Sequence, residues 1–114
     1  MTLLGVKNLI NSVNCPVETW VTPAKDENGE DIDLPFGTLA KPKNSSIVYG
    51  DNTVQKVYGV VELYLAMKKD DEASELAMDR KLIENGFEYE YQMYYMPEEN
   101  IVIKVYTFEI EEDL

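Results

Sequence analysis

Chemistry in this chain would have to come from carboxylates and a single thiol. The 114 residues include 22 Asp and Glu, one cysteine (Cys15) and no histidine. The chain therefore lacks the usual general base at neutral pH, and one cysteine forms neither an internal disulfide nor a thiolate zinc site. Because Cys15 has no histidine partner and no obvious cationic neighbour, we expect a buried, inert thiol. Carboxylate catalysis needs two acids in one cleft, and the sequence singles out no such pair, so we expect no enzymatic activity and no cofactor.

One acidic stretch has the composition of a metal-binding loop. Asp26, Asn28 and Glu30 have the spacing of the first three ligands of a calcium loop of the EF-hand type. The sixth position of such a loop requires Gly and holds Asp31, and the twelfth requires Glu and holds Gly37. The match fails at both positions, so we expect a solvated loop and no metal site.

The charge is distributed unevenly along the chain. The net charge is -12, and residues 70–114 hold fourteen acidic residues against three basic ones. Residues 34–69 instead hold five lysines against two acids. Binding nucleic acid through its phosphates needs a basic footprint, which this composition excludes. The acidic part is an ordinary solvated surface, a surface for a basic partner, or a surface to which DNA must not bind.

The composition is that of a single folded domain over residues 1–114. The 45% hydrophobic fraction and the eight tyrosines argue against a disordered chain. No apolar run approaches the ~20 residues of a membrane helix. The N-terminal residues lack the basic segment that precedes the apolar part of a signal peptide. We therefore expect a cytoplasmic protein with no membrane contact.

Hydrophobic periodicity predicts seven elements in the order α-β-β-β-α-β-β. Helices are expected where apolar residues recur every three or four positions, and strands where they alternate. The helices are expected over about residues 3–13 and 70–85, and the strands over 17–22, 45–50, 54–67, 87–96 and 101–110. The connections are expected to include a mobile acidic loop at 23–33, an apolar turn at 34–38 and a frayed tail at 111–114. The fold class is therefore α+β, with a mostly antiparallel mixed sheet of about five strands packed with two helices.

The helix expected over residues 70–85 has clear end signals. Asp70 is expected to cap its start, and Gly86 is expected to end it in the left-handed conformation. Its main apolar stripe consists of Ala73, Leu76, Ala77 and Ile83. Met78 and Leu82 extend this stripe sideways, so we expect the helix to contact more than one surface. The strands on either side of it are expected to run parallel, as in a crossover unit.

The two longest strands have different patterns. In the strand over 54–67, one face is expected to hold Val57, Gly59, Val61, Leu63 and Leu65, with Gly59 at a bulge or a close approach. The strand over 101–110 is apolar on both faces, which a sheet buried on one side does not need. Either a helix covers each face of the sheet, or one face meets another chain.

A series of short motifs spans about residues 35–110. Each motif alone has an ordinary structural explanation. Only the order and spacing of the whole series support a comparison with a known family. Along the chain they are Pro35-Phe36, Ile47-Val48-Tyr49, Asp51-Asn52, Val54-Gln55-Lys56-Val57, Val61-Glu62-Leu63-Tyr64, Lys68-Lys69-Asp70, Glu75, Leu82, Gly86, Tyr89, Tyr94, Glu98-Glu99 and Tyr106. The series resembles the tail-terminator and tail-completion (head-tail joining) proteins of long-tailed bacteriophages, especially those of Gram-positive hosts. The acidic loop at 23–33 is longer and more acidic than in that family.

The resemblance implies a structural protein of the virion tail or neck. Such proteins assemble, in the host cytoplasm, into a ring that is usually a hexamer on the head-proximal end of the tail tube. Their implied partners are further copies of the chain, the tail tube protein and the head connector protein. The ring stops tube growth, and DNA passes through its centre without being bound specifically.

A ring of one small domain needs two different contact patches on each chain. For these subunit contacts we expect Tyr58, Tyr64, Tyr94, Val105, Tyr106 and Phe108, with ordinary core packing as the alternative. For an acidic lumen that repels DNA we expect Glu88, Glu90, Glu98 and Glu99, with a solvated face as the alternative.

A second hypothesis from a different class is a small acidic inhibitor that mimics DNA. It predicts carboxylates in two rows at the spacing of phosphates, on a monomer or dimer that binds a basic protein. The tyrosines and methionines of residues 87–96 suit packing better than mimicry. The two hypotheses are separated by the mass of the protein in solution.

Overall fold

The computed structural model describes residues 1–20, 33–50 and 53–112, and the acidic loop expected at 23–33 lies almost entirely outside them. These described residues form two helices and five strands in the predicted order, and the predicted α+β class is confirmed. The elements are α1 (Leu3–Ile10), β1 (Val17–Thr19), β2 (Phe36–Gly50), β3 (Thr53–Lys68), α2 (Glu72–Glu84), β4 (Tyr89–Met96) and β5 (Ile101–Glu111).

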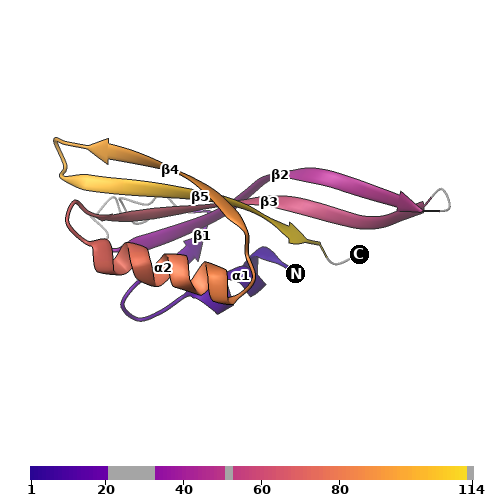
Figure 1. Ribbon diagram of the computed structural model, residues 1–114, viewed down its shortest axis with the longest axis horizontal. Coiled ribbons are helices and arrows are strands. Elements are labelled where there is room, and N and C mark those ends of the chain that lie inside the picture. The colour runs from indigo at the N-terminus through magenta and orange to yellow at the C-terminus, as the bar shows by residue number, and fades with distance from the viewer. Residues whose placement is uncertain (21–32, 51–52, 113–114) are drawn as a thin grey trace.

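The strands form one mixed sheet in the order β1-β2-β3-β5-β4. The short β1 pairs parallel with β2, and the other neighbours are antiparallel. Because β3 and β4 each run antiparallel to β5, they run parallel to each other, as predicted, with β5 inserted between them. The helix α2 connects these two parallel strands along one face of the sheet (Figure 1).

The hairpin of β2 and β3 is longer than the sequence indicates. The strand predicted at 45–50 is present but begins nine residues earlier, because the chain from Phe36 to Gly50 forms one strand. The apolar turn predicted at 34–38 is therefore wrong from Phe36 onward. Pairing of β3 with β5 ends at Tyr58, whereas pairing with β2 continues to Thr53. The hairpin therefore extends past the rest of the sheet and gives the molecule its elongated shape, 54 × 30 × 25 Å (Figure 1).

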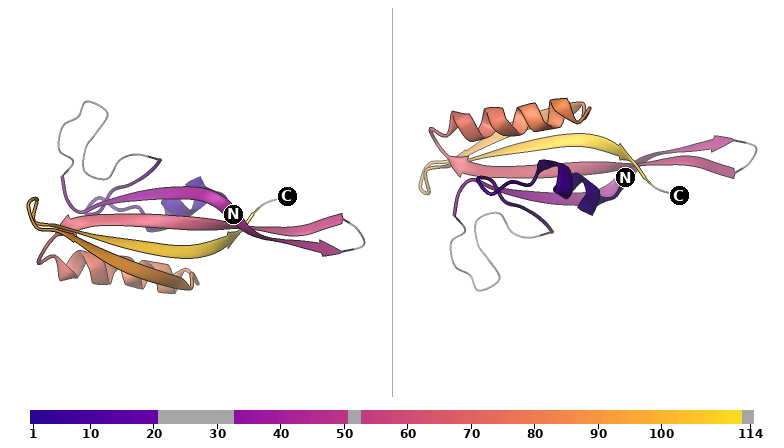
Figure 2. Two further views of the ribbon diagram at one scale, coloured as in Figure 1. Left: turned by 90° about the horizontal axis from the view of Figure 1, so that it is seen from above. Right: turned by 90° about the horizontal axis from the view of Figure 1, so that it is seen from below.

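Both helices lie on the same face of the sheet (Figures 1 and 2). The predicted alternation of β3 is confirmed, because Val61, Leu63 and Leu65 are fully buried under the helices. The core between the two layers is completed by side chains of α1, α2, β1, β2 and β5, namely Val6, Ile10, Val17, Leu39, Met78, Leu82, Tyr106, Phe108 and Ile110. Burial of this apolar area is the main source of stability of the fold.

The helix α2 differs from its prediction at its start and in its buried surface. The N-cap is Asp71 rather than Asp70, and its carboxylate accepts a hydrogen bond from the backbone N–H of Ser74. Gly86 follows the helix with φ +79°, which confirms the predicted left-handed terminator. Met78 and Leu82 face the core, whereas the four residues predicted as the main apolar stripe, Ala73, Leu76, Ala77 and Ile83, are exposed.

The chain ends pack more tightly than the sequence predicts. The strand β5 continues to Glu111, and Glu112 forms an ion pair with Lys41, so these two residues are not a frayed tail. This ion pair crosses Gly59, where a Cβ atom would lie 2.5 Å from a carboxylate oxygen of Glu112. The prediction of a close approach at Gly59 is therefore confirmed. Cys15 is buried as expected, and this burial raises the pKa of its thiol.

Candidate subunit interface

The face of the sheet opposite the helices is the candidate functional surface. Within the described residues, no helix or strand lies over β3, β5 and β4 on this side (Figure 2). We call this area the bare face and define it by three rows across the three strands. From one end to the other, the rows are Glu62–Thr107–Glu90, Tyr64–Val105–Gln92 and Ala66–Ile103–Tyr94. Two of the three rows are largely apolar, and the first ends in a carboxylate on each side.

The side chains of the bare face surround an open depression of about 400 Å³. Its floor is formed by Ile103 and Val105 of β5, and its sides are formed by residues of β3 and β4. The Tyr64 hydroxyl donates a hydrogen bond to Glu62 over 2.6 Å, and the Tyr94 hydroxyl donates one to Gln92 over 2.5 Å. These bonds fix both aromatic rings beside an apolar floor, which is an arrangement suited to contact with another protein.

The carboxylate of Glu62 shapes the electrostatics of this surface. Its hydrogen bond from Tyr64, aided by partial burial, raises the pKa of the tyrosine to about 12. Tyr64 is therefore a neutral donor at neutral pH. The surface offers aromatic and aliphatic contacts with negative charge at one edge.

The structure brings together part of the predicted interface set. Tyr64, Tyr94 and Val105 lie together on the bare face, and Tyr58 lies two positions from Val60 along the same side of β3. Tyr106 and Phe108 are corrected, because both are buried under the helices and are only 0% and 2% exposed. They occupy the opposite side of β5 from Val105.

The four predicted lumen residues do not form one cluster. Glu88 and Glu90 lie at the start of β4, whereas Glu98 and Glu99 lie in the turn after its end. A strand of this length separates the two pairs by roughly 25 Å. All four are exposed, and Glu90 alone belongs to the bare face as defined by the three rows.

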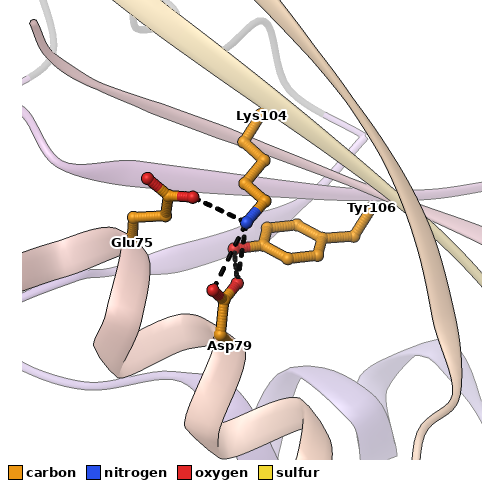
Figure 3. Close-up of polar contacts among 4 residues, drawn as sticks. All are labelled: Glu75, Asp79, Lys104 and Tyr106. Carbon is orange, nitrogen blue, oxygen red and sulfur yellow. Dashed lines mark hydrogen bonds and ion pairs between the residues drawn. The ribbon is translucent and has the colours of Figure 1, made fainter. Parts of the chain in front are cut away.

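The covered face contains a buried ionic cluster that the sequence analysis missed. Lys104 of β5 is only 2% exposed and lies among apolar residues. Its Nζ atom is 2.7 Å from a carboxylate oxygen of Glu75 and 3.0 Å from one of Asp79, both on α2 (Figure 3). The Tyr106 hydroxyl donates a 2.5 Å hydrogen bond to Asp79. The same ammonium lies 4.4 Å from the centre of the Tyr91 ring.

This cluster attaches α2 to the sheet. Burial alone would lower the pKa of Lys104, but its hydrogen bonds with Glu75 and Asp79 outweigh burial and raise that pKa. Burial and the bond to Asp79 also raise the pKa of Tyr106. Both groups stay protonated at neutral pH, so neither is a nucleophile or a base. The sequence does contain a signal for this cluster. Lys104 interrupts an otherwise apolar alternation of Val102, Tyr106 and Phe108, and a lysine on a buried strand face requires acidic partners.

No group of three or more Cys, Asp or Glu side chains among the described residues is placed to hold a metal ion. None of the described helices is both long enough and apolar enough to cross a membrane. Comparisons of the chain with protein-family models, with curated proteins and with solved structures find no significant match.

Proposed function

We propose that this protein is a structural component of a phage virion that forms a ring at the head-proximal end of the tail tube. There the ring ends tube growth and joins the tail to the head connector. The observation that carries the proposal is the bare face, an apolar and aromatic surface on a strand whose other side already forms the core. The resemblance of residues 35–110 to tail-terminator proteins supplies the biological setting.

An uncovered apolar surface on a small domain favours association with another protein. Apolar patches rimmed by polar residues are typical of protein contacts, and tyrosine is enriched at their centres. The bare face has this composition, with Ile103 and Val105 between Tyr64 and Tyr94. The partner that the proposal requires for this surface is another copy of the chain.

The charge of the chain suits a ring through which DNA passes. The net charge is -12, and Glu88, Glu90, Glu98 and Glu99 are exposed. An acidic surface repels phosphates at short range, so DNA moves past it without binding. In this proposal the tail tube protein and the head connector protein are the other partners. Assembly takes place in the host cytoplasm, and the product is part of the virion.

The mass of the full chain in solution tests the proposal. Light scattering over a range of concentrations, with negative-stain images of the same samples, should give closed rings of about six chains, the number that the resemblance implies. A monomer at every concentration would contradict the ring and favour the acidic inhibitor instead. A pull-down with basic proteins would then be the next experiment.

A further inference from the structure

The outer surface of α2 has an apolar stripe that the fold of a single chain does not use. Leu76 and Ile83 are 60% and 65% exposed, although Met78 and Leu82 of the same helix are buried. Leu76, Arg80 and Ile83 follow the spacing i, i+4, i+7, which places them along one side of the helix. We call these three residues the outer stripe. A helix with one apolar side toward its own sheet and another toward solvent is suited to packing between two sheets.

Arg80 gives the outer stripe a positive charge at its centre. The side chain is exposed, and no carboxylate of the described residues forms an ion pair with it. The other basic residue of the helix, Lys81, donates its hydrogen bond to the backbone oxygen of Ile10. Glu72 lies one turn before Leu76 on the same side of the helix, and Glu84 follows Ile83 at the other end. Within the outer stripe itself, two apolar residues flank one cation.

The bare face has the complementary pattern. Ile103 and Val105 supply an apolar floor, and the adjacent row ends in Glu62 and Glu90. The positions of β4 and β5 on this face hold no lysine or arginine. The stripe is about 10 Å long from Leu76 to Ile83, and the three rows of the bare face cover about 14 Å. The two surfaces therefore match in length and in polarity, and Arg80 is opposite in charge to Glu62 and Glu90.

These two surfaces lie on opposite sides of the molecule. The helices lie below the sheet in Figure 1, and the bare face lies above it. A contact between the bare face of one copy and the helix of another therefore uses a different patch on each chain. Such a head-to-tail contact repeats from copy to copy and gives a ring when the rotation between copies closes.

We propose that α2 of one copy docks through its outer stripe on the bare face of the next copy, with Arg80 beside Glu62 and Glu90. The inference rests on the proposed ring and identifies its repeating contact. The neighbour's helix then covers the second face of the sheet, so that each sheet in the assembly lies between two helical layers. This also accounts for the two apolar faces of β5.

Two variants that each block one patch test this contact. A helix variant carries Leu76→Asp and Ile83→Asp, and a sheet variant carries Val105→Asp. Both helix positions are exposed, so those substitutions are expected to leave the monomer folded. Circular-dichroism melts check each variant. If Val105→Asp does not fold, Tyr94→Asp replaces it, since Tyr94 is 52% exposed.

The expected result is that each variant alone is a monomer and that their mixture forms only a heterodimer. The intact sheet of the helix variant binds the intact helix of the sheet variant, and the other two patches are blocked. Light scattering should then report twice the chain mass of 13.1 kDa and no larger species.

Other outcomes overturn the inference in recognisable ways. If the helix variant still assembles alone, the outer stripe is not part of the contact. If the sheet variant still assembles alone, the bare face is not part of it. If the wild-type chain forms rings but the mixture stays monomeric, the ring uses other surfaces. A wild-type chain that is monomeric at every concentration instead removes the proposed ring itself.

A charge exchange tests the place of Arg80 within the contact. Arg80→Glu should weaken assembly several-fold, because it would face two carboxylates across the contact. Adding Glu62→Lys and Glu90→Lys on the same chain should restore part of the loss. Arg80→Glu with no effect on the concentration needed for assembly would contradict the docking geometry. Lys69→Glu, also exposed and outside both patches, is the matched control.

Discussion

The two faces of β5 illustrate how one strand can serve two purposes. Tyr106 is completely buried beneath α2, and its neighbour Val105 lies on the bare face. The covered face has a continuous apolar core and a buried lysine whose hydrogen bonds are satisfied by α2. The bare face also carries aliphatic and aromatic residues, but no helix or strand of the described residues lies over them. The covered face therefore accounts for the stability of the chain, and the bare face is available for a partner.

The largest difference between the faces is expected in the free energy of unfolding. Leu63→Ala removes a fully buried side chain beneath the helices, and it should cost about 2–5 kcal/mol. Val105→Ala on the bare face should cost about 1 kcal/mol or less in the monomer, because that side chain is partly exposed. Urea unfolding of monomeric samples measures both values. Equal losses would contradict the division of roles between the faces.

A smaller effect is expected from the buried ionic cluster. Lys104→Met leaves the carboxylates of Glu75 and Asp79 without their cation, and it should cost about 2 kcal/mol because water still reaches both acids. The same substitution at Lys7, whose pair with Glu18 is exposed, should cost less than about 1 kcal/mol. Comparing the two urea midpoints isolates the effect of burial. A stability of Lys104→Met equal to that of wild type would show that the cluster does not hold α2.

The smallest of these effects is a loss of stability at alkaline pH. The pKa values of Lys104 and Tyr106 are raised in the folded chain, so folding favours their protonated forms. Their contribution is complete below the ordinary pKa values of about 10 and is lost as pH rises above them. Thermal melts between about pH 8 and pH 11 should show a falling midpoint, and Tyr106→Phe should make that fall less steep. An unchanged pH profile in Tyr106→Phe would contradict the role of this hydroxyl.

The sequence predicted the sheet better than the helix surfaces. Alternation along residues 57–65 placed Val61, Leu63 and Leu65 together on one face, because side chains in a strand repeat every two residues, and the structure shows that this face is the buried one. The helix α2 offers two apolar sides, and periodicity alone favoured the side with Leu76 and Ile83. The side with Met78 faces the core because Glu75 and Asp79 lie next to it and meet Lys104. That pairing depends on contacts between distant parts of the chain.

The residues of the predicted interface set divide between the two faces of the sheet for a related reason. The two-sided pattern of the strand 101–110 indicated that either a helix covers each face of the sheet or one face meets another chain. It did not indicate which face, so Tyr106 and Phe108 were grouped with Val105 although they lie on the other side. The position of both helices on one face of the sheet separates the two groups, and periodicity within one strand does not contain that information.

Tyr94 and Tyr95 offer the most direct test of the central claim that the bare face is covered by a neighbouring chain. They are adjacent in β4, are 52% and 51% exposed, and point to opposite faces of the sheet. Tyrosine-selective chemical modification, read by mass spectrometry, should proceed at similar rates at both positions in dilute monomer. In assembled protein, modification of Tyr94 should slow several-fold while that of Tyr95 stays unchanged. Equal rates at the two positions in the assembly would contradict the account.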